Sequence, residues 1–191
     1  MTRPVRAAVA HHSGFGHTAR QARAVADGAK EALNTQQGLG LVRQHGSADR
    51  WLAVLVTRRA DGTPATSVVN AGILPHPTTG RPVVAFVARG ATAKLTNLRR
   101  DPLATLVFRA GWEWVAVAGP ALLAGPDDPL PGLDTERLRV LLRDIYTAAG
   151  GVHDDLSVYD QVMTAERRTA VLIEPARFTT NPAGTEHQEH V

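Results

Sequence analysis

Short apolar runs separated by turn residues dominate the middle of the chain. Each run has the length and the residue types of a β-strand, and most are bounded by Gly, Pro, Asn or Asp. The six runs cover residues 51–58, 64–71, 83–88, 103–108, 112–123 and 169–174. Because the runs are short and joined by tight turns, the pattern favours an antiparallel barrel over a parallel sheet.

Apolar residues recur at helical spacing near the N-terminus. Residues 22–33 carry Ala, Val and Leu on one face of a predicted helix, and Asn34 is a suitable residue to end it. A weaker helical stretch is predicted around residues 39–42, where Gly38 and Gly40 lower the helix propensity. We therefore expect helices, rather than strands, before the first apolar run.

Further helices are predicted among the strands. Thr92 is a candidate N-cap for a helix over residues 92–100, which the Asp-Pro pair that follows brings to an end. Asp134 is expected to cap a helix with an apolar stripe, and another short helix is expected around residues 159–163. The stripe consists of Leu138, Leu141, Leu142 and Ile145.

The composition excludes several classes of protein. The 191 residues include no cysteine, which rules out disulfides, thiolate catalysis, iron–sulfur ligation and cysteine-based zinc sites. No apolar run reaches the roughly 18 residues of a membrane-spanning helix, and the apolar stretch near the N-terminus is too short for a signal peptide. We therefore expect a cytoplasmic protein with no membrane partner.

The charge is unevenly distributed along the chain. Residues 1–100 carry fourteen Lys or Arg against four Asp or Glu, a balance of +10, whereas residues 101–191 have a balance of −7. The basic half suits an anionic ligand, or alternatively it pairs with the acidic half or with a second subunit. Nucleic acid is the least favoured anion, because aromatic residues make up only 5% of the chain and no reading motif occurs.

Residues 89–102 (RGATAKLTNLRRDP) combine features of an anion site. A strand ends, a Gly-containing turn follows, and a helix begins whose first turn presents free N–H groups and the positive end of the helix dipole. Thr92 adds a hydroxyl there, and Arg89 and Lys94 add full positive charge. The segment therefore suits a phosphate or a carboxylate, although a basic surface helix would have the same residue types.

Residues 83–108 and 111–123 resemble the pyridoxamine-5′-phosphate-oxidase-like split barrels. The string A-K-x-x-N-L-R-R-D-P (residues 93–102) and the segment Tyr159 to Arg168 are similar to their actinobacterial branch, which uses the deazaflavin coenzyme F420. The resemblance implies a mainly β fold with flanking helices, an antiparallel FMN-binding split barrel of about six strands. It also implies three parts of the chain, an N-terminal extension, the cofactor-binding domain and a disordered tail. These parts cover residues 1–36, 37–182 and 183–191.

The resemblance assigns a phosphate site to the start of the helix over residues 92–100. Lys94 would hold the cofactor's phosphate with Arg89 and Thr92, and Asn97, one turn further on, would support the site or simply brace its helix. Many members of the family have an arginine at the position of Thr92. Phosphate binding is therefore predicted to be weaker, unless Arg89 takes the place of that arginine.

The resemblance also implies where the cofactor's ring system binds and which residues approach it from a partner subunit. Backbone groups of the second strand would meet the polar edge of the ring, and the residues there are Ser67, Val68, Val69 and Asn70. Trp112 and Trp114 would approach from the partner of a homodimer. They alternate along a predicted strand, so packing at the dimer interface explains them as well as cofactor contact does.

The implied activity is hydride transfer from reduced coenzyme F420 to an unsaturated or quinone-like small molecule, with the matching proton taken from solvent. An FMN-dependent oxidase or reductase of the same fold and a non-catalytic flavin or deazaflavin carrier are the alternatives. The anionic glutamate tail of the coenzyme would suit Arg59, Arg89 or Arg99. For Arg99 and Arg100, however, structural ion pairs are favoured, for example with Asp101 or with acids of the second half of the chain. No catalytic side chain is predicted, because the cofactor supplies the chemistry.

Residues 8–33 resemble a different family, the flavodoxin-like quinone reductases. The similarity covers their first strand, phosphate loop and first helix, with S-G-F-G-H-T at residues 13–18 as the loop. One strand–helix unit cannot bury its own apolar faces, so we interpret the segment as an extension packed on the barrel or on its partner. No metal site is predicted, since nothing supports one at His11, His12 or His17.

Overall fold

The computed structural model describes residues 33–181. The helices in this part of the chain are α2 (Thr35–Ala48), α3 (Ala93–Arg100), α4 (Thr135–Ala148) and α5 (Leu156–Ala165). The strands are β1 (Leu52–Arg58), β2 (Pro64–Pro75), β3 (Pro82–Ala88), β4 (Leu103–Ala110), β5 (Glu113–Ala124), β6 (Thr169–Ile173) and β7 (Arg177–Thr180).

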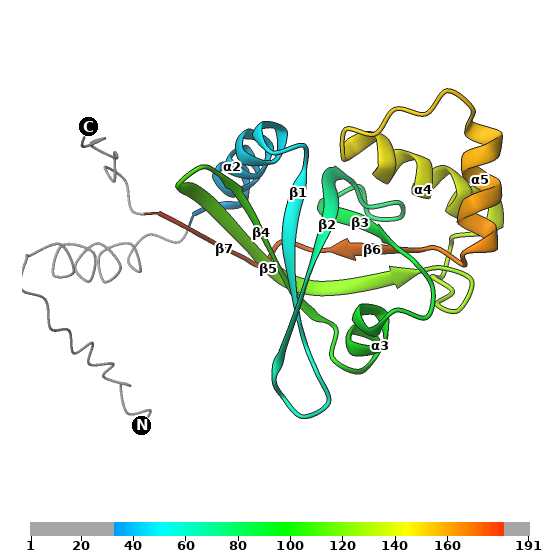
Figure 1. The fold of residues 1–191 in the computed structure, drawn as a ribbon, viewed down its shortest axis with the longest axis horizontal. Helices are drawn as coiled ribbons and strands as arrows, with labels where there is room; N and C mark the ends of the chain where they lie inside the picture. Colours follow the sequence, from blue (N-terminus) through cyan, green and yellow to red (C-terminus); the bar gives the residue numbers. More distant parts are fainter. Residues whose placement is uncertain (1–32, 182–191) are drawn as a thin grey trace, which may run out of the picture. The chain divides into compact units, whose positions relative to one another are not determined.

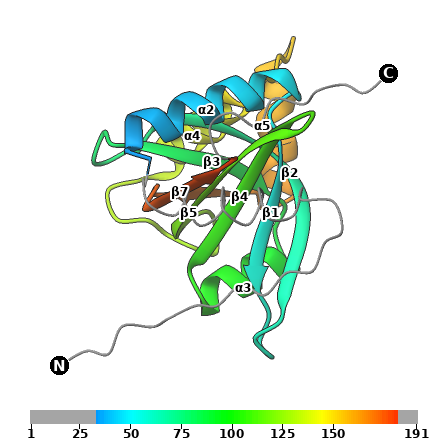
Figure 2. The same ribbon diagram turned by 90° about the vertical axis from the view of Figure 1, so that its left-hand side faces the viewer.

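Six of the strands close into an antiparallel barrel (Figures 1 and 2). Their order around the barrel is β4-β1-β2-β3-β6-β5, and the pairing of β4 with β5 closes the ring. The short β7 also pairs with β5 and lies outside the ring. The six-stranded antiparallel barrel with flanking helices confirms the predicted fold class.

Two long strands, β2 and β5, each change partner along their length. Residues 64–70 of β2 pair with β1, whereas residues 71–75 pair with β3. In the same way, residues 113–120 of β5 pair with β4 and residues 121–124 pair with β6. The barrel therefore consists of two sheets that share these two strands.

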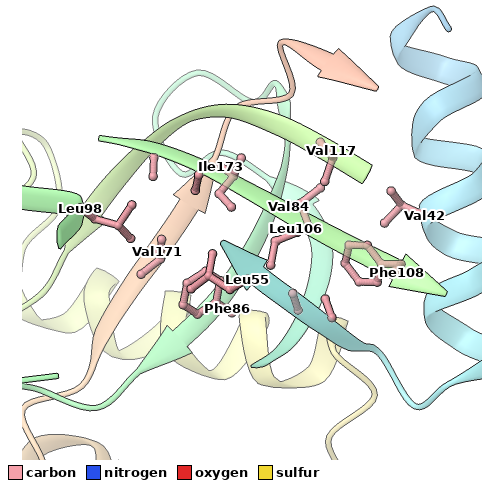
Figure 3. Close-up of a cluster of buried hydrophobic side chains, with 14 of the residues drawn as sticks. Val42, Leu55, Val84, Phe86, Leu98, Leu106, Phe108, Val117, Val171 and Ile173 are labelled. Atoms are coloured by element: carbon pink, nitrogen blue, oxygen red, sulfur yellow. The ribbon is translucent and has the colours of Figure 1, made fainter. Parts of the chain in front are cut away.

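The interior of the barrel is filled by side chains that alternate along the strands (Figure 3). They include Leu55, Val84, Phe86, Leu106, Phe108, Val117 and Ile173, each inaccessible to solvent. Most strands bury every second residue, as expected for a strand with one face on the core. All of β6 and most of β3 are buried, because their outer faces are covered as well.

Helices α4 and α5 supply that outer cover (Figure 1). α4 packs against β2 and β3 with its apolar stripe, in which Leu141, Leu142 and Ile145 are buried. Asp160 of α5 accepts hydrogen bonds from two arginines of α4 and thereby joins the helices. Arg143 Nε lies 2.8 Å from one carboxylate oxygen, and an Arg139 guanidinium nitrogen lies 2.9 Å from the other.

The strands follow the predicted runs closely but extend further in places. β2 continues to Pro75, four residues beyond the predicted strand, and the short β7 was not predicted. The predicted helix over residues 22–33 lies outside the described residues. None of the helices in residues 33–181 is long and apolar enough to cross a membrane.

The helix that Asn34 was predicted to end precedes the described residues, and the structure shows a second role for Asn34 at the start of the next helix. Asn34 is the N-cap of α2: its side chain accepts a hydrogen bond from the Gln37 N–H at 2.9 Å, and the Gln37 side chain accepts from the Asn34 N–H at 3.1 Å. This reciprocal capping box starts a helix of 14 residues where only a weak helical stretch was expected.

The two glycines that weakened the helix prediction have different surroundings. A Cβ atom on Gly38 would lie 2.2 Å from Cγ of the Phe178 ring, because α2 packs closely against β7 at this point. A Cβ atom on Gly40 would meet nothing within 4 Å. Gly38 is therefore required by packing, whereas Gly40 only lowers the stability of the helix.

We expect opposite effects from alanine at these two positions. Gly38→Ala forces Phe178 or α2 to move and should lower the free energy of unfolding by about 1–3 kcal/mol, the usual cost of overpacking. Gly40→Ala should raise it by up to about 1 kcal/mol through helix propensity. Urea denaturation of both variants measures the difference, and equal effects of the two substitutions would contradict this account of the α2–β7 contact.

Candidate functional site

A pocket of about 720 Å³ opens where the two sheets of the barrel separate, between β2, the end of β3 and the helices α4 and α5. This volume lies in the range of small-molecule and cofactor sites. Its described lining combines basic residues with apolar and aromatic ones. The lining residues used below are Arg50, Val68, Val69, Asn70, Arg89, Thr92, Lys94, Tyr146, His153, Tyr159, Met163 and Arg168.

The turn between β3 and α3 forms the basic end of the pocket. Thr92 is the N-cap of α3 in an extended conformation, and its hydroxyl donates a hydrogen bond to the Arg89 carbonyl at 2.9 Å. The Gly90 N–H donates to the Glu166 carbonyl at 3.1 Å, which fixes the turn against the segment before β6. The start of α3, with Lys94 in its first turn, therefore faces the pocket from a braced loop.

Four cationic side chains line the pocket: Arg50, Arg89, Lys94 and Arg168. No Asp or Glu occurs among the described lining residues. Glu166, just outside, forms ion pairs with two of the four, at 3.6 Å to Arg89 and 2.5 Å to Arg168. Within residues 33–181 the other two have no ion-pair partner, so the pocket carries a net positive charge that favours an anionic ligand.

One wall of the pocket is the part of β2 that β3 does not cover. Val68 is 63% exposed, a high value for an apolar side chain on a barrel strand. The Asn70 side-chain amide donates to the Arg50 carbonyl at 3.0 Å and so holds the start of β1 beside this wall. Because β3 pairs only from Ala71 onward, the backbone edge of residues 64–70 that faces away from β1 has no partner strand among residues 33–181.

The opposite wall consists of the end of α4, the loop after it and α5. The rings of Tyr146, His153 and Tyr159 contact one another, with the two tyrosine centroids 5.0 Å apart. Both phenol groups donate to backbone carbonyls at 2.9 Å, Tyr146 to Val152 and Tyr159 to Leu142. Burial raises the pKa of Tyr159 to about 12, so this phenol stays protonated and neutral.

Close packing brings the two walls together. A Cβ atom on Gly72 of β2 would lie 2.2 Å from the carbonyl carbon of Ala148, so only glycine lets the end of α4 approach the strand this closely. The approach places Tyr146 and Ala149 within the same pocket as Val68 and Val69. The geometry of the pocket therefore depends on a backbone contact as well as on its lining side chains.

Six of the ten residues predicted to bind the cofactor lie together in this pocket. They are Val68, Val69, Asn70, Arg89, Thr92 and Lys94. Their assignment to a cofactor stays a prediction, but the structure joins two segments, residues 68–70 and 89–94, that the sequence could only connect through the family resemblance.

The other four predicted residues lie elsewhere. Ser67 pairs with Leu55 in the ladder between β1 and β2 and is absent from the described lining of the pocket. Trp114 lies at the start of β5, and Trp112 lies in the turn before it with 58% exposure. The prediction that both tryptophans alternate along one strand is therefore wrong for Trp112, and their contact with a cofactor stays a prediction that would need a partner subunit.

Asn97 braces the barrel instead of facing the pocket. Its side chain is buried, and the amide donates to the Thr57 hydroxyl of β1 at 3.1 Å. This contact agrees with the alternative interpretation of Asn97 as a residue that supports its own helix. Any effect on ligand binding would have to pass through the position of α3.

The three arginines predicted to suit the anionic tail of the cofactor, Arg59, Arg89 and Arg99, do not lie together in the pocket. Only Arg89 lines the pocket, since the Arg59 side chain bonds to Thr63 and Pro64 within the β1–β2 hairpin. Arg99 forms a bidentate ion pair with Asp128, with both distances 2.7 Å. The expectation of a structural ion pair with the acidic half of the chain is therefore confirmed for Arg99.

Sequence reasoning did not assign six of the twelve lining residues named above to the site. They are Arg50, Tyr146, His153, Tyr159, Met163 and Arg168. Tyr159, Met163 and Arg168 fall within the segment Tyr159 to Arg168, which carries the family resemblance but was not assigned to the site. For Tyr146 and His153 the local signal is the pair Gly150-Gly151, which ends α4 and turns the chain back past the pocket.

Comparison with known proteins agrees with the fold. No protein-family model matches the chain. An FMN-binding, pyridoxamine 5′-phosphate oxidase-related protein of Nostoc punctiforme has a TM-score of 0.55 at 15% identity, over 78% of this chain and 84% of that protein. A conserved hypothetical protein of Mycobacterium tuberculosis has a TM-score of 0.53 at 17% identity, over 78% and 91%. At such identities the likeness shows the fold alone: residues 33–180 form an FMN-binding-type split barrel.

We expect Asn97 to matter for stability rather than for the pocket. Asn97→Ala leaves the Thr57 hydroxyl without its donor and should lower the free energy of unfolding by about 1–3 kcal/mol. Thr96→Ala, at an exposed position on the same helix, is the control and should change it by about 0.5 kcal/mol or less. Denaturant titration measures both, and an Asn97→Ala protein of unchanged stability would remove the bracing role.

Proposed function

We propose that this protein binds coenzyme F420 in the pocket and transfers a hydride from its reduced form to an unsaturated or quinone-like small molecule. The observation that carries the proposal is the composition of the pocket. A helix N-terminus and four cations line it, together with apolar and aromatic walls. Such a site suits a ligand with an anionic chain and a flat ring system.

The basic end fits the phosphate of such a cofactor. Lys94 and the N–H groups of the first turn of α3 would hold the phosphate, with Arg89 beside them. Arg50 and Arg168 add two further positive charges to the same pocket. A single phosphate needs fewer cations, so the surplus supports a coenzyme with additional carboxylates, such as the glutamate tail of F420.

The part of the pocket where the two sheets separate suits the ring system of the cofactor. The unpaired backbone edge of residues 64–70 offers N–H and C=O groups to the polar edge of a flat ring. Val68 gives that ring an apolar surface, and Met163 and the two tyrosines lie across the pocket. The protein would thus bind and orient the ring, and the bound cofactor would supply the hydride.

FMN is the second candidate cofactor. It carries one phosphate and a similar tricyclic ring, and the Nostoc protein of the same fold is described as FMN-binding. The resemblance of residues 93–102 to the deazaflavin-dependent branch and the surplus of cations favour coenzyme F420.

Removal of the Lys94 charge should weaken cofactor binding. Lys94→Ala should raise the Kd for coenzyme F420 by about tenfold to a hundredfold, the effect of one charged hydrogen bond. Arg43→Ala removes one charge from the exposed face of α2, outside the described lining of the pocket, and should leave the Kd unchanged. Fluorescence titration with coenzyme F420 and separately with FMN measures the effect.

The outcomes separate the alternatives. Tighter binding of FMN would transfer the proposal to a flavin-dependent enzyme of the same fold. Tight binding of coenzyme F420 without turnover of any quinone or enone would support a carrier. Failure to bind either compound would contradict the proposed function and leave the fold unaffected.

We also propose that the protein acts as a homodimer. The outer faces of β1 and β2 carry exposed apolar side chains beside the pocket: Leu52, Val54 and Val68 are 36%, 38% and 63% exposed. Val54 is paired in register with Val68 on one side and with Val107 of β4 on the other, so these side chains form a continuous strip. A strip of this kind is typical of a surface that a second subunit covers.

A charge in this strip should separate the subunits. Val54→Lys should raise the dimer dissociation constant by at least about tenfold, because a charge in the core of an interface is poorly solvated. Val140→Lys introduces the same change at a valine of 43% exposure on α4 and should leave association unchanged. Sedimentation equilibrium measures both, and a monomeric wild-type protein would overturn the proposal.

A further inference from the structure

We propose that His153 is a substrate-contacting residue, which donates a hydrogen bond from Nε2 to the carbonyl oxygen of the substrate. This inference rests on the proposed hydride transfer and adds to it a side chain that stabilises the negative charge formed on the substrate. His153 lies in the loop between α4 and α5 and lines the pocket. No other part of the proposed function uses it.

The backbone fixes which nitrogen of His153 carries the proton. The Asp155 N–H donates to Nδ1 of His153 at 3.1 Å. A backbone N–H can only donate, so Nδ1 must accept and the neutral ring carries its proton on Nε2. Asp155 is itself held in place as the N-cap of α5, since its carboxylate accepts from the Ser157 N–H at 2.8 Å and the Val158 N–H at 3.3 Å.

The ring of His153 is also held by two aromatic neighbours. Its centroid lies 5.9 Å from that of Tyr159 at an interplanar angle of 70°, and 6.5 Å from that of Tyr146 at 65°. These edge-on contacts restrict rotation of the imidazole. A ring held on two sides and bonded through Nδ1 presents Nε2–H in a defined position.

His153 is the free side-chain donor of this wall. The wall carries three polar side chains among its described lining residues, and both tyrosine hydroxyls already donate to backbone carbonyls. Nε2 of His153 has no partner within residues 33–181, and the side chain is exposed. Arg50 and Arg168, which also line the pocket, belong to the segments before β1 and β6.

The chemistry of the proposed step requires a donor of this kind. When the β-carbon of a conjugated carbonyl compound accepts a hydride, the π electrons move to the carbonyl oxygen, which becomes an enolate oxygen. Nε2–H would stabilise that charge, and water would then supply the matching proton, to the α-carbon of an enone or to an oxygen of a quinone. The reduced deazaflavin loses the two electrons that the substrate gains, so the step balances. A neutral imidazole is suited to stabilise the oxyanion without giving up its own proton.

Two substitutions test the hydrogen bond. His153→Leu removes the donor with little change of volume, and His153→Gln keeps an N–H near the position of Nε2. With menadione as the probe, His153→Leu should lower kcat/KM by about tenfold to a hundredfold, and His153→Gln should recover most of the loss. The Kd for coenzyme F420 should stay unchanged in both variants, whereas a merely structural role would alter it.

A measurement without turnover tests the same proposal. In ¹⁵N NMR spectra of the full chain at pH 8, Nε2 of His153 should resonate as the protonated nitrogen and Nδ1 as the acceptor. Addition of menadione to the protein should shift the Nε2–H resonance. A ring protonated on Nδ1, an Nε2–H resonance that menadione leaves in place, or an unchanged kcat/KM in His153→Leu would overturn the proposal.

The two proposals fail in different ways. Loss of the proposed function appears as a wild-type protein that binds neither coenzyme F420 nor FMN, whatever the state of His153. Failure of the inference about His153 appears as normal cofactor binding together with one of the three contrary results above.

Discussion

The exchange of partners along β2 is the constraint on which the rest of the structure depends. Residues 64–70 pair with β1 and residues 71–75 pair with β3, so one strand belongs to two sheets that diverge at Ala71. The divergence exposes one backbone edge of β2 and leaves room for the pocket beside it. A barrel in which β3 continued its pairing along β2 would have no such opening. The closure of the barrel and the existence of the pocket therefore have the same origin.

The fold was largely predictable because each barrel strand is a short apolar run bounded by turn residues. The run 103–108 (LATLVF) has the length and residue types of a strand, and the structure shows that it buries every second residue. The start of α2 was not predictable in the same way, because Asn34 is a good residue both to end one helix and to cap the next. Gly38 lowers helix propensity, and only the packing against Phe178 explains why it occurs within a helix.

The residues of the candidate site also fall into two groups: those that local sequence brings together and those that only tertiary packing brings together. Arg89, Thr92 and Lys94 lie within six consecutive residues, so one turn and one helix start are enough to bring them together. Tyr146 and His153 reach the pocket because α4 approaches β2 at Gly72, and no local pattern reports such an approach. The basic end of the pocket was therefore visible in the sequence, and its aromatic wall was not.

The family resemblance implied an arginine at the position of Thr92, and the surroundings of Thr92 give it a different role. The Thr92 hydroxyl donates to the carbonyl of Arg89, so it fixes the backbone of the residue that supplies the positive charge. The guanidinium of Arg89 is 66% exposed and shares Glu166 with Arg168, at a distance of 3.6 Å that leaves most of its donors available. Glu166 thus positions both Arg89 and Arg168, and its single negative charge leaves the pair of arginines with a net positive charge. In the proposed phosphate site, the Thr92 hydroxyl would order the turn and Arg89, three residues earlier, would supply the positive charge that an arginine at the N-cap would carry.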